Sequence, residues 1–223
     1  MNNDFILVLN CGSSSLKFSL INPANGSTLL SGLAERLLSE HAIIKIKYNG
    51  DKQQYAVSAP FDHQTAISCL VDQLNQLSLT DCITAIGHRV VHGGEAYCQP
   101  TLINNDVKAT IKNLARLAPL HNPANLTGII AAEAAFPALK QVAIFDTAFH
   151  QTMPEKAYIY GIPYALYKQH GIRRYGFHGT SHYFVAQQAA NIIDKPLAQC
   201  SFISAHLGNG CSIAAIKDGK SVD

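Results

Sequence analysis

The chain has 223 residues, of which 48% are hydrophobic, and its 17 Lys and Arg residues nearly balance its 15 Asp and Glu residues, for a net charge of +2. This composition provides for a sizeable buried core and includes no basic tract or acidic tail, which argues against a nucleic-acid partner and against a membrane-surface role. No apolar run reaches the ~18 residues that a transmembrane helix needs, and the six cysteines are scattered without a zinc-binding spacing, so we expect a cytoplasmic protein with reduced thiols.

The first predicted element is a strand–loop–strand unit. An apolar strand from Phe5 leads into the polar loop Asn10–Lys17, with the sequence Asn-Cys-Gly-Ser-Ser-Ser-Leu-Lys, and a second strand runs to Leu20. Gly12 allows close approach of the backbone, the serines offer O–H and N–H donors, and Lys17 adds a positive charge. These features suit a polyphosphate, although an ordinary hairpin with a serine-rich turn explains the isolated loop equally well.

The middle of the chain alternates predicted strands and helices. The predicted strands are 31–34, 42–48, 83–86 and 141–145, and the predicted helices are 63–77, 105–117, 125–136 and 183–193. Residues 148–180 are rich in Pro, Gly and Tyr and are interpreted as a long crossover. This order predicts an α/β fold with a mixed sheet flanked by helices.

A second strand–loop–strand unit occupies residues 200–216. Its loop, His206–Gly210, contains Gly and Asn residues and follows an apolar strand, as the first loop does. A repeated unit suggests two duplicated domains, predicted as 1–147 and 148–223, and the second is expected to be truncated. By itself the second loop is more typical of a glycine hairpin, but as a pair the loops favour phosphate binding from two sides.

Three polar side chains are predicted where loops follow apolar segments, the usual place for sites in open α/β sheets. Arg89, flanked by His88 and His92, can hold a carboxylate through two hydrogen bonds, although a surface ion pair is the commoner role of a lone arginine. Asp146 can bind Mg²⁺, act as a base, or cap a helix. His178 can donate to a developing phosphoryl charge or cap the helix that follows it.

A divided phosphate site, a carboxylate-holding arginine and a strand-end aspartate together indicate phosphoryl transfer. The chain resembles the acetate and propionate kinase family of the actin-like sugar-kinase superfamily. The resemblance rests on blocks distributed along the whole chain, namely Asn10–Lys17, Gly87–Gly94, Pro119–Pro123, Phe145–His150, Arg174–His182 and His206–Gly210. It implies an actin-like (ribonuclease H-like) fold and covers about the first half of a typical family member.

The resemblance also implies roles for individual residues. The implied catalytic residues are Asp146, His178 and His121, and His121 lies in a proline-bracketed turn where local capping is the ordinary interpretation. Arg89 is implied to bind the substrate carboxylate, and Val91, Leu120 and Phe177 to line the pocket for its alkyl group. The nucleotide phosphates are assigned to Ser13, Ser15, Lys17, His206, Leu207, Gly208, Asn209 and Gly210, and the metal to Asn10.

The implied reaction is reversible transfer of a phosphoryl group from ATP to acetate, giving ADP and acetyl phosphate, by a homodimer with Mg²⁺ or Mn²⁺. Because a carboxylic acid with a pKa near ~4 is already ionised at neutral pH, Asp146 is expected to orient Mg²⁺ and its waters. The alternatives are a propionate or butyrate kinase of the same family and a non-catalytic actin-like nucleotide-binding protein. A second catalytic arginine and the adenosine-binding segments belong to later residues of the family, so the 223 residues alone are expected to be nearly inactive.

Overall fold

The computed structural model describes residues 4–208 and 210–223, and the chain divides into two compact units. The first unit comprises Met1–Val90 and Pro100–Ile144, and the second comprises Val91–Gln99 and Phe145–Asp223. This division differs from the expected one at residue 147 mainly in the segment Val91–Gln99, which belongs to the second unit.

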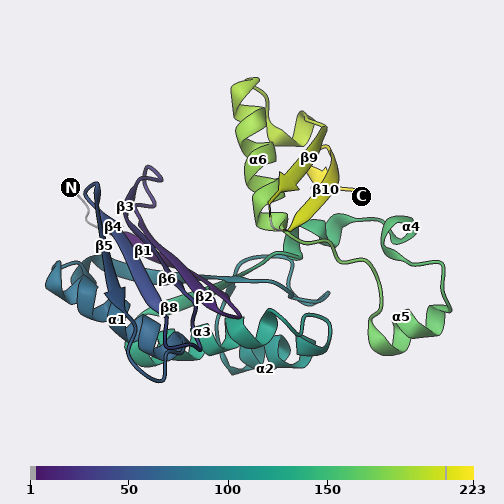
Figure 1. Ribbon diagram of the computed structural model, residues 1–223. Helices are drawn as coiled ribbons and strands as arrows, with labels where there is room; N and C mark the ends of the chain where they lie inside the picture. Colours follow the sequence, from purple (N-terminus) through teal and green to yellow (C-terminus); the bar gives the residue numbers. More distant parts are fainter. Residues whose placement is uncertain (1–3, 209) are drawn as a thin grey trace. The chain divides into compact units, whose positions relative to one another are not determined.

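An eight-stranded mixed sheet forms the centre of the first unit (Figure 1). The strand order is β5-β4-β3-β2-β1-β6-β8-β7, in which β1 to β5 form an antiparallel meander and β6 runs parallel to β1. The strands are β1 Phe5–Gly12, β2 Ser15–Ile21, β3 Thr28–Glu35, β4 Ile43–Tyr48, β5 Asp51–Ala56, β6 Ile83–Val90, β7 Thr101–Leu102 and β8 Lys140–Phe145. The predicted mixed α/β fold is confirmed.

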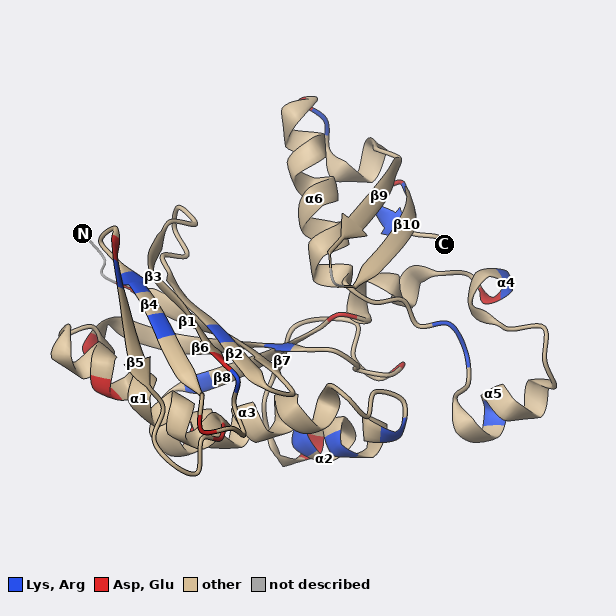
Figure 2. Cartoon of the chain, in the orientation of Figure 1, with Lys and Arg blue, Asp and Glu red and all other residues tan. Residues whose placement is uncertain are grey.

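Period-two alternation places one face of the meander in the core. On β4, Ile44 and Ile46 are buried while Lys45 and Lys47 are exposed, and Figure 2 shows the resulting blue segments on this strand. The helices of the unit are α1 His63–Gln76, α2 Asn105–Asn113 and α3 Asn122–Ala135. Helix α3 packs on β1 and contacts both α1 and α2, so the helices cover the apolar positions of the central strands.

Side chains define where the first two helices begin. Asp62 accepts a hydrogen bond from the Thr65 amide at 2.8 Å before α1, and Asn104 accepts one from the Val107 amide at 2.9 Å before α2. These caps satisfy backbone donors that have no partner inside the helix.

Several elements differ from their predicted bounds for local reasons. β6 continues through Gly87 to Val90, because its pairing with β1 continues past the glycine, so Arg89 lies in a strand and not in the loop after it. Helix α3 begins at Asn122, because Pro123 is suited to a first helical turn. Residues Leu114–Arg116, predicted as helix, form a separate 3₁₀ turn after α2. The edge strand β5 escaped prediction because its side chains are polar and mostly exposed.

The second unit contains a three-stranded sheet with the order β11-β10-β9 and one long helix beside it. Its elements are α4 Glu155–Tyr158, α5 Tyr164–His170, α6 Gly179–Ile192, β9 Phe202–Leu207, β10 Cys211–Lys217 and β11 Lys220–Ser221. Helix α6 begins four residues before its predicted start and packs on β9 through buried residues such as Ala186. Short 3₁₀ turns lie at Thr80–Cys82 in the first unit and at Ala148–Thr152 and Leu197–Gln199 in the second.

Polar contacts hold the segment Val91–Gln99 within the second unit. The Glu95 carboxylate accepts from Arg173 NH1 at 2.5 Å and from the Tyr167 hydroxyl at 3.0 Å. The ring of Tyr97 stacks on Phe145 with centroids 4.9 Å apart. These contacts explain why a segment that follows β6 directly in sequence belongs to the second unit.

Within the described ranges, no helix is both long enough and apolar enough to cross a membrane.

Replacing Gly128 with Ala is expected to destabilise the first unit by about 1–3 kcal/mol, even though Ala favours a helix over Gly. A Cβ at this position of α3 would overlap Sγ of buried Cys11 on β1. Urea unfolding measures the change, and Gly161→Ala is the control, since nothing lies within 4 Å of a Cβ added there. Unchanged stability of Gly128→Ala would contradict the close packing of α3 on β1.

Candidate functional site

The predicted polar loop near the N-terminus is a tight hairpin. Gly12 pairs with Ser15 across β1 and β2, so Ser13 and Ser14 alone form the turn. Ser13 and Lys17 are exposed and Ser15 is half-buried. The hairpin therefore leaves the Ser13 hydroxyl and the Lys17 ammonium accessible to a ligand. Its turn contains fewer residues than the sequence suggested.

Two side chains hold the carbonyl groups at the base of this hairpin. His63 Nε2 lies 2.7 Å from the Gly12 oxygen, and Asn125 Nδ2 donates to the Cys11 oxygen at 2.7 Å. Buried carbonyls need such partners, and His63 and Asn125 come from the first turns of α1 and α3. Sequence reasoning missed both residues, because their contacts are with distant segments of the chain.

Arg89 and Asn10 lie side by side near the ends of the neighbouring parallel strands β6 and β1. The pairing of Leu9 with His88 brings the next residues of both strands together, and Arg89 NH1 donates to Asn10 Oδ1 at 3.3 Å. The neighbouring His88 is buried against Gln141 Oε1 at 2.6 Å, and burial lowers the pKa of His88 to about 4. His88 is therefore uncharged at neutral pH and adds no charge beside the Arg89 guanidinium.

Leu120 and His121 lie at the start of α3 in the first unit. Leu120 is 73% exposed and His121 is exposed at the N-cap position, where its side chain makes no capping hydrogen bond. The side chain of His121 therefore does not cap α3, contrary to the ordinary interpretation of its turn.

In the second unit, the start of α6 is held against Asp146. The Gly179 amide donates to the main-chain oxygen of buried Asp146 at 2.9 Å, and a Cβ at position 179 would overlap that oxygen. The preceding residue, His178, has a φ of 56° at the N-cap and makes no side-chain capping bond. A left-handed conformation at a residue other than glycine is uncommon and is concentrated at functional sites.

The same histidine lies against the second hairpin. His206 and Leu207 are the last residues of β9, so the predicted loop is shorter than expected, and Asn209 lies outside the described residues. The rings of His178 and His206 stack with centroids 4.1 Å apart, and a Cβ at Gly210 would lie 3.2 Å from Nε2 of His178. The structure thus brings His178 together with the second predicted loop.

Two serine hydroxyls contact His178 and a second histidine of α6, His182. Ser212 Oγ lies 2.9 Å from His178 Nδ1 and 2.8 Å from His182 Nε2, and Ser204 Oγ lies 2.9 Å from His182 Nδ1. Burial is the main reason that the pKa of His182 falls to about 4. Sequence reasoning missed this network, although the four-residue spacing of His178 and His182 places both on one helix face.

The two remaining pocket residues are also in the second unit. Val91 is buried, and Phe177 is 38% exposed. The ring of buried His92 lies 5.8 Å from that of Phe177 and 4.4 Å from that of Tyr175. Burial lowers the pKa of His92 to about 4, and its Nδ1 accepts from the Gly94 amide at 3.0 Å. Phe177 thus lies beside an uncharged, buried histidine, and Val91 directly precedes that histidine in the chain.

The predicted site residues therefore fall into two groups. The first unit contains the serine hairpin, the Asn10–Arg89 pair, Leu120 and His121, and the second contains Val91, Asp146, Phe177, His178 and the second hairpin.

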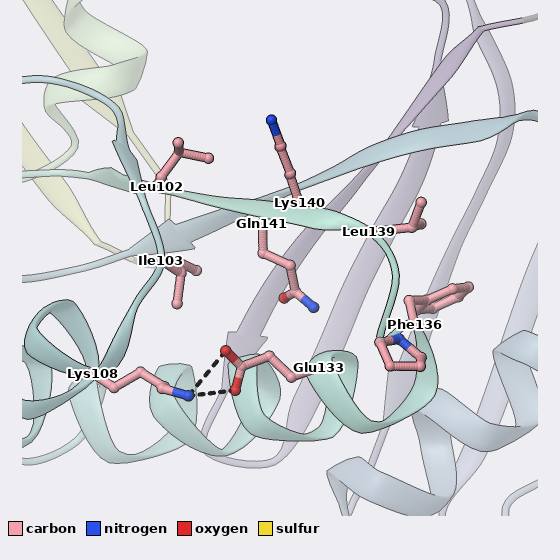
Figure 3. Close-up of a pocket in the computed structure, with 9 residues that line it drawn as sticks. Leu102, Ile103, Lys108, Glu133, Phe136, Leu139, Lys140 and Gln141 are labelled. Atoms are coloured by element: carbon pink, nitrogen blue, oxygen red, sulfur yellow. Dashed lines mark hydrogen bonds and ion pairs between the residues drawn. The ribbon is translucent and has the colours of Figure 1, made fainter.

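A separate cavity of about 440 Å³ lies in the first unit (Figure 3). Lys108 and Glu133 form an ion pair in it at 2.7 Å, below the side-chain amide of Gln141. It contains none of the predicted site residues, and we assign it no role.

Comparison with known proteins identifies the family of this α/β protein with two polar hairpins. The chain belongs to the Acetokinase family, whose model matches residues 5–223. It is 54% identical over 225 residues to the acetate kinase of Shewanella sp. (strain W3-18-1), and 53% identical over 224 residues to acetate kinase 2 of Vibrio cholerae. Each match covers 100% of this chain and 56% of the relative, so the chain spans little more than half the length of these proteins.

Solved structures give the same result. A propionate kinase from Francisella tularensis matches with a TM-score of 0.95 and 48% identity, covering 99% of this chain and 56% of that chain. The acetate kinase of Porphyromonas gingivalis matches with a TM-score of 0.92 and 43% identity, with the same coverage. The predicted family resemblance and the α/β fold are both confirmed.

The buried and the exposed cysteines of this protein are expected to differ sharply in their reactivity toward iodoacetamide. Burial raises the pKa of Cys11 to about 12, whereas Cys98 and Cys211 are exposed. At pH 8 the thiolate fraction of Cys11 is then on the order of 10⁻⁴. Iodoacetamide followed by peptide mass spectrometry should find Cys98 and Cys211 modified in the folded protein, and Cys11 modified only after denaturation in urea. Rapid modification of folded Cys11 would contradict its role as a packing residue.

Proposed function

We propose that the protein to which this chain belongs is an acetate kinase, which transfers a phosphoryl group reversibly between ATP and acetate. The observation that carries the proposal is the pairing of Arg89 with Asn10 in one unit, and of His178 with the second hairpin in the other, in a chain of the Acetokinase family. A carboxylate-binding group and phosphate-binding hairpins are what this reaction requires.

Arg89 is proposed to bind the carboxylate of the acid. Its guanidinium is half-buried at the end of β6 and oriented by the Asn10 side chain. A planar guanidinium can donate two parallel hydrogen bonds to a carboxylate, which fixes one carboxylate oxygen in the direction of attack. Val91, Leu120 and Phe177 are proposed to contact the alkyl group, and their apolar side chains support this role.

The two hairpins are proposed to bind the phosphates of ATP. Ser13, Ser15 and Lys17 supply hydroxyl and ammonium donors from the first hairpin. The second contributes His206, Leu207, Gly208, Asn209 and Gly210. Glycines beside a phosphate let backbone N–H groups approach closely.

The proposed transfer is in line. A carboxylate oxygen forms a bond to the γ-phosphorus, the bond to the bridging oxygen of ADP breaks, and the electron pair leaves with ADP. No proton moves, because the acid is already ionised. His178 is proposed to donate a hydrogen bond to charge on the transferred group, with His121 nearby, in a reaction that depends mainly on position and electrostatics.

Asn10 and Asp146 are proposed to hold Mg²⁺ or Mn²⁺. An amide oxygen and a carboxylate are the donors that a hard cation prefers, and Mg²⁺ commonly uses one or two protein oxygens together with substrate phosphates. The described residues contain no cluster of three His, Cys, Asp or Glu side chains suited to a metal. Bound there, Mg²⁺ would neutralise charge on the β- and γ-phosphates.

The finer assignments follow the family. We propose a homodimer in the cytoplasm, and the six free cysteines agree with this reducing compartment. A propionate kinase is the second candidate, favoured by the Francisella tularensis structure. One methylene changes selectivity by only about 1–3 kcal/mol, so Val91, Leu120 and Phe177 do not separate the two acids.

Asp146→Asn in the full-length protein is expected to lower kcat about 10- to 100-fold at low Mg²⁺ concentration, by analogy with other groups that orient metal ligands. Because Asp146 is proposed to act through the metal, added Mg²⁺ should restore much of the loss and leave the pH dependence of kcat unchanged. Initial rates over a grid of pH and Mg²⁺ concentration measure both effects. A changed pH profile that Mg²⁺ does not correct would indicate proton transfer instead.

The proposed activity is tested by trapping the acyl phosphate with hydroxylamine, using full-length protein, ATP and either acetate or propionate. Arg89→Lys should raise KM for the acid about 10-fold or more, because an ammonium cannot reproduce the two-point contact, with little change in KM for ATP. Arg36→Lys is the matched control at an exposed position. Product from neither acid would refute the proposal and favour a non-catalytic nucleotide-binding protein.

A further inference from the structure

Four side chains form a continuous hydrogen-bonded chain through the second unit. It runs from Ser204 on β9 to His182 on α6, then to Ser212 on β10 and finally to His178 at the N-cap of α6. The three links measure 2.9, 2.8 and 2.9 Å. Ser204 and His182 are 6% and 1% exposed, so the chain begins in the protein interior.

The buried end sets the direction of these hydrogen bonds. In the part of the chain that the structure describes, the Ser204 hydroxyl has one hydrogen-bond partner, His182 Nδ1. Leaving a buried hydroxyl hydrogen without an acceptor is energetically unfavourable. Ser204 therefore donates its hydrogen, and His182 Nδ1 accepts it.

The remaining links follow from the number of hydrogens on each group. The titratable groups that act on His182 are His150, His178 and His206, and burial together with these rings keeps it uncharged, with a pKa of about 4. An uncharged imidazole carries one hydrogen, so with Nδ1 accepting, Nε2 of His182 donates to Ser212. The single hydrogen of Ser212 is then left to donate to Nδ1 of His178.

We infer that His182 and Ser212 are positioning residues that hold the ring hydrogen of His178 on Nε2. That nitrogen lies beside Gly210 of the second hairpin, 3.2 Å from where a Cβ of this residue would be. The inference rests on the proposed function for its purpose, because an N–H at this place can donate to a phosphoryl oxygen, whereas a bare nitrogen would repel it.

Stacking of His178 on His206 further restricts the orientation of the His178 ring. The two rings are nearly parallel, at 15°, and His206 Nδ1 lies 2.9 Å from Ser181 Oγ. Stacking fixes the plane of the His178 ring, and the bond from Ser212 fixes its rotation within that plane. Together they define the direction in which Nε2–H points.

The tautomer can be measured directly. Full-length protein labelled with ¹⁵N-histidine is examined by long-range ¹H–¹⁵N NMR at pH 8, with the His178 signal assigned from its loss in His178→Gln. We expect a hydrogen on Nε2 and none on Nδ1 in the parent. In Ser212→Ala the two nitrogen shifts should move toward each other, because the hydrogen bond that Ser212 donates to Nδ1 is then lost.

The kinetic effect should appear in kcat. Ser212→Ala is expected to lower kcat about 10- to 100-fold and to change KM for ATP and for the acid less than threefold. Ser212→Thr keeps the hydroxyl and should recover both the tautomer and most of kcat. Ser201→Ala removes an exposed hydroxyl just before β9 and should behave as the parent.

Ser204→Ala tests the buried end of this series of hydrogen bonds. The His178 tautomer can be measured in this variant even where Ser212→Ala folds poorly. Loss of this donor lets His182 reverse its hydrogen bonds, so the His178 tautomers should mix although no contact of His178 has been altered. A parent with the hydrogen on Nδ1, or tautomers unchanged in both alanine variants, overturns the inference. A parent with the expected tautomer but no acyl phosphate product refutes the proposed function and still supports the hydrogen-bond order.

Discussion

The close approach of the α6 backbone to Asp146 is the constraint on which the polar cluster of the second unit depends. The Gly179 amide donates to the Asp146 carbonyl, and only glycine fits, because any side chain would overlap that oxygen. The helix is therefore held at its first residue, and His178 must enter it in a left-handed conformation. This contact fixes the backbone from which the His178 imidazole reaches Ser212 and the second hairpin.

Four buried histidines in this protein, namely His88, His92, His150 and His182, serve as hydrogen-bonding groups and not as charges. Burial lowers the pKa of His88, His92, His150 and His182, so each is uncharged at neutral pH. Each also has a polar partner, which avoids the cost of a buried unsatisfied nitrogen. Arg89, beside Asn10, supplies positive charge in the first unit that the neighbouring His88 does not.

The parts of the fold that the sequence predicted well have a strong local signal. The stripe of apolar residues over 63–77 became α1 with nearly the predicted bounds, because helical periodicity requires only neighbouring residues. Strand β5 has no such signal, since its residues are polar and its pairing partner defines it. The end of β6 was missed for a related reason, as pairing with β1 carries it past Gly87.

The residue types of the candidate site were visible in the sequence, because a serine-rich turn, an arginine near a glycine pair and a strand-end aspartate can each be located from side-chain chemistry and nearby glycines. The sequence by itself thus determined the family, the α/β class and the candidate residues. Only the tertiary structure decided that Arg89 lies against Asn10, and that Ser204 and Ser212 orient the histidines of α6. Such contacts join residues that are from 22 to 79 positions apart in the chain, so packing between distant elements creates them, and no local pattern records it.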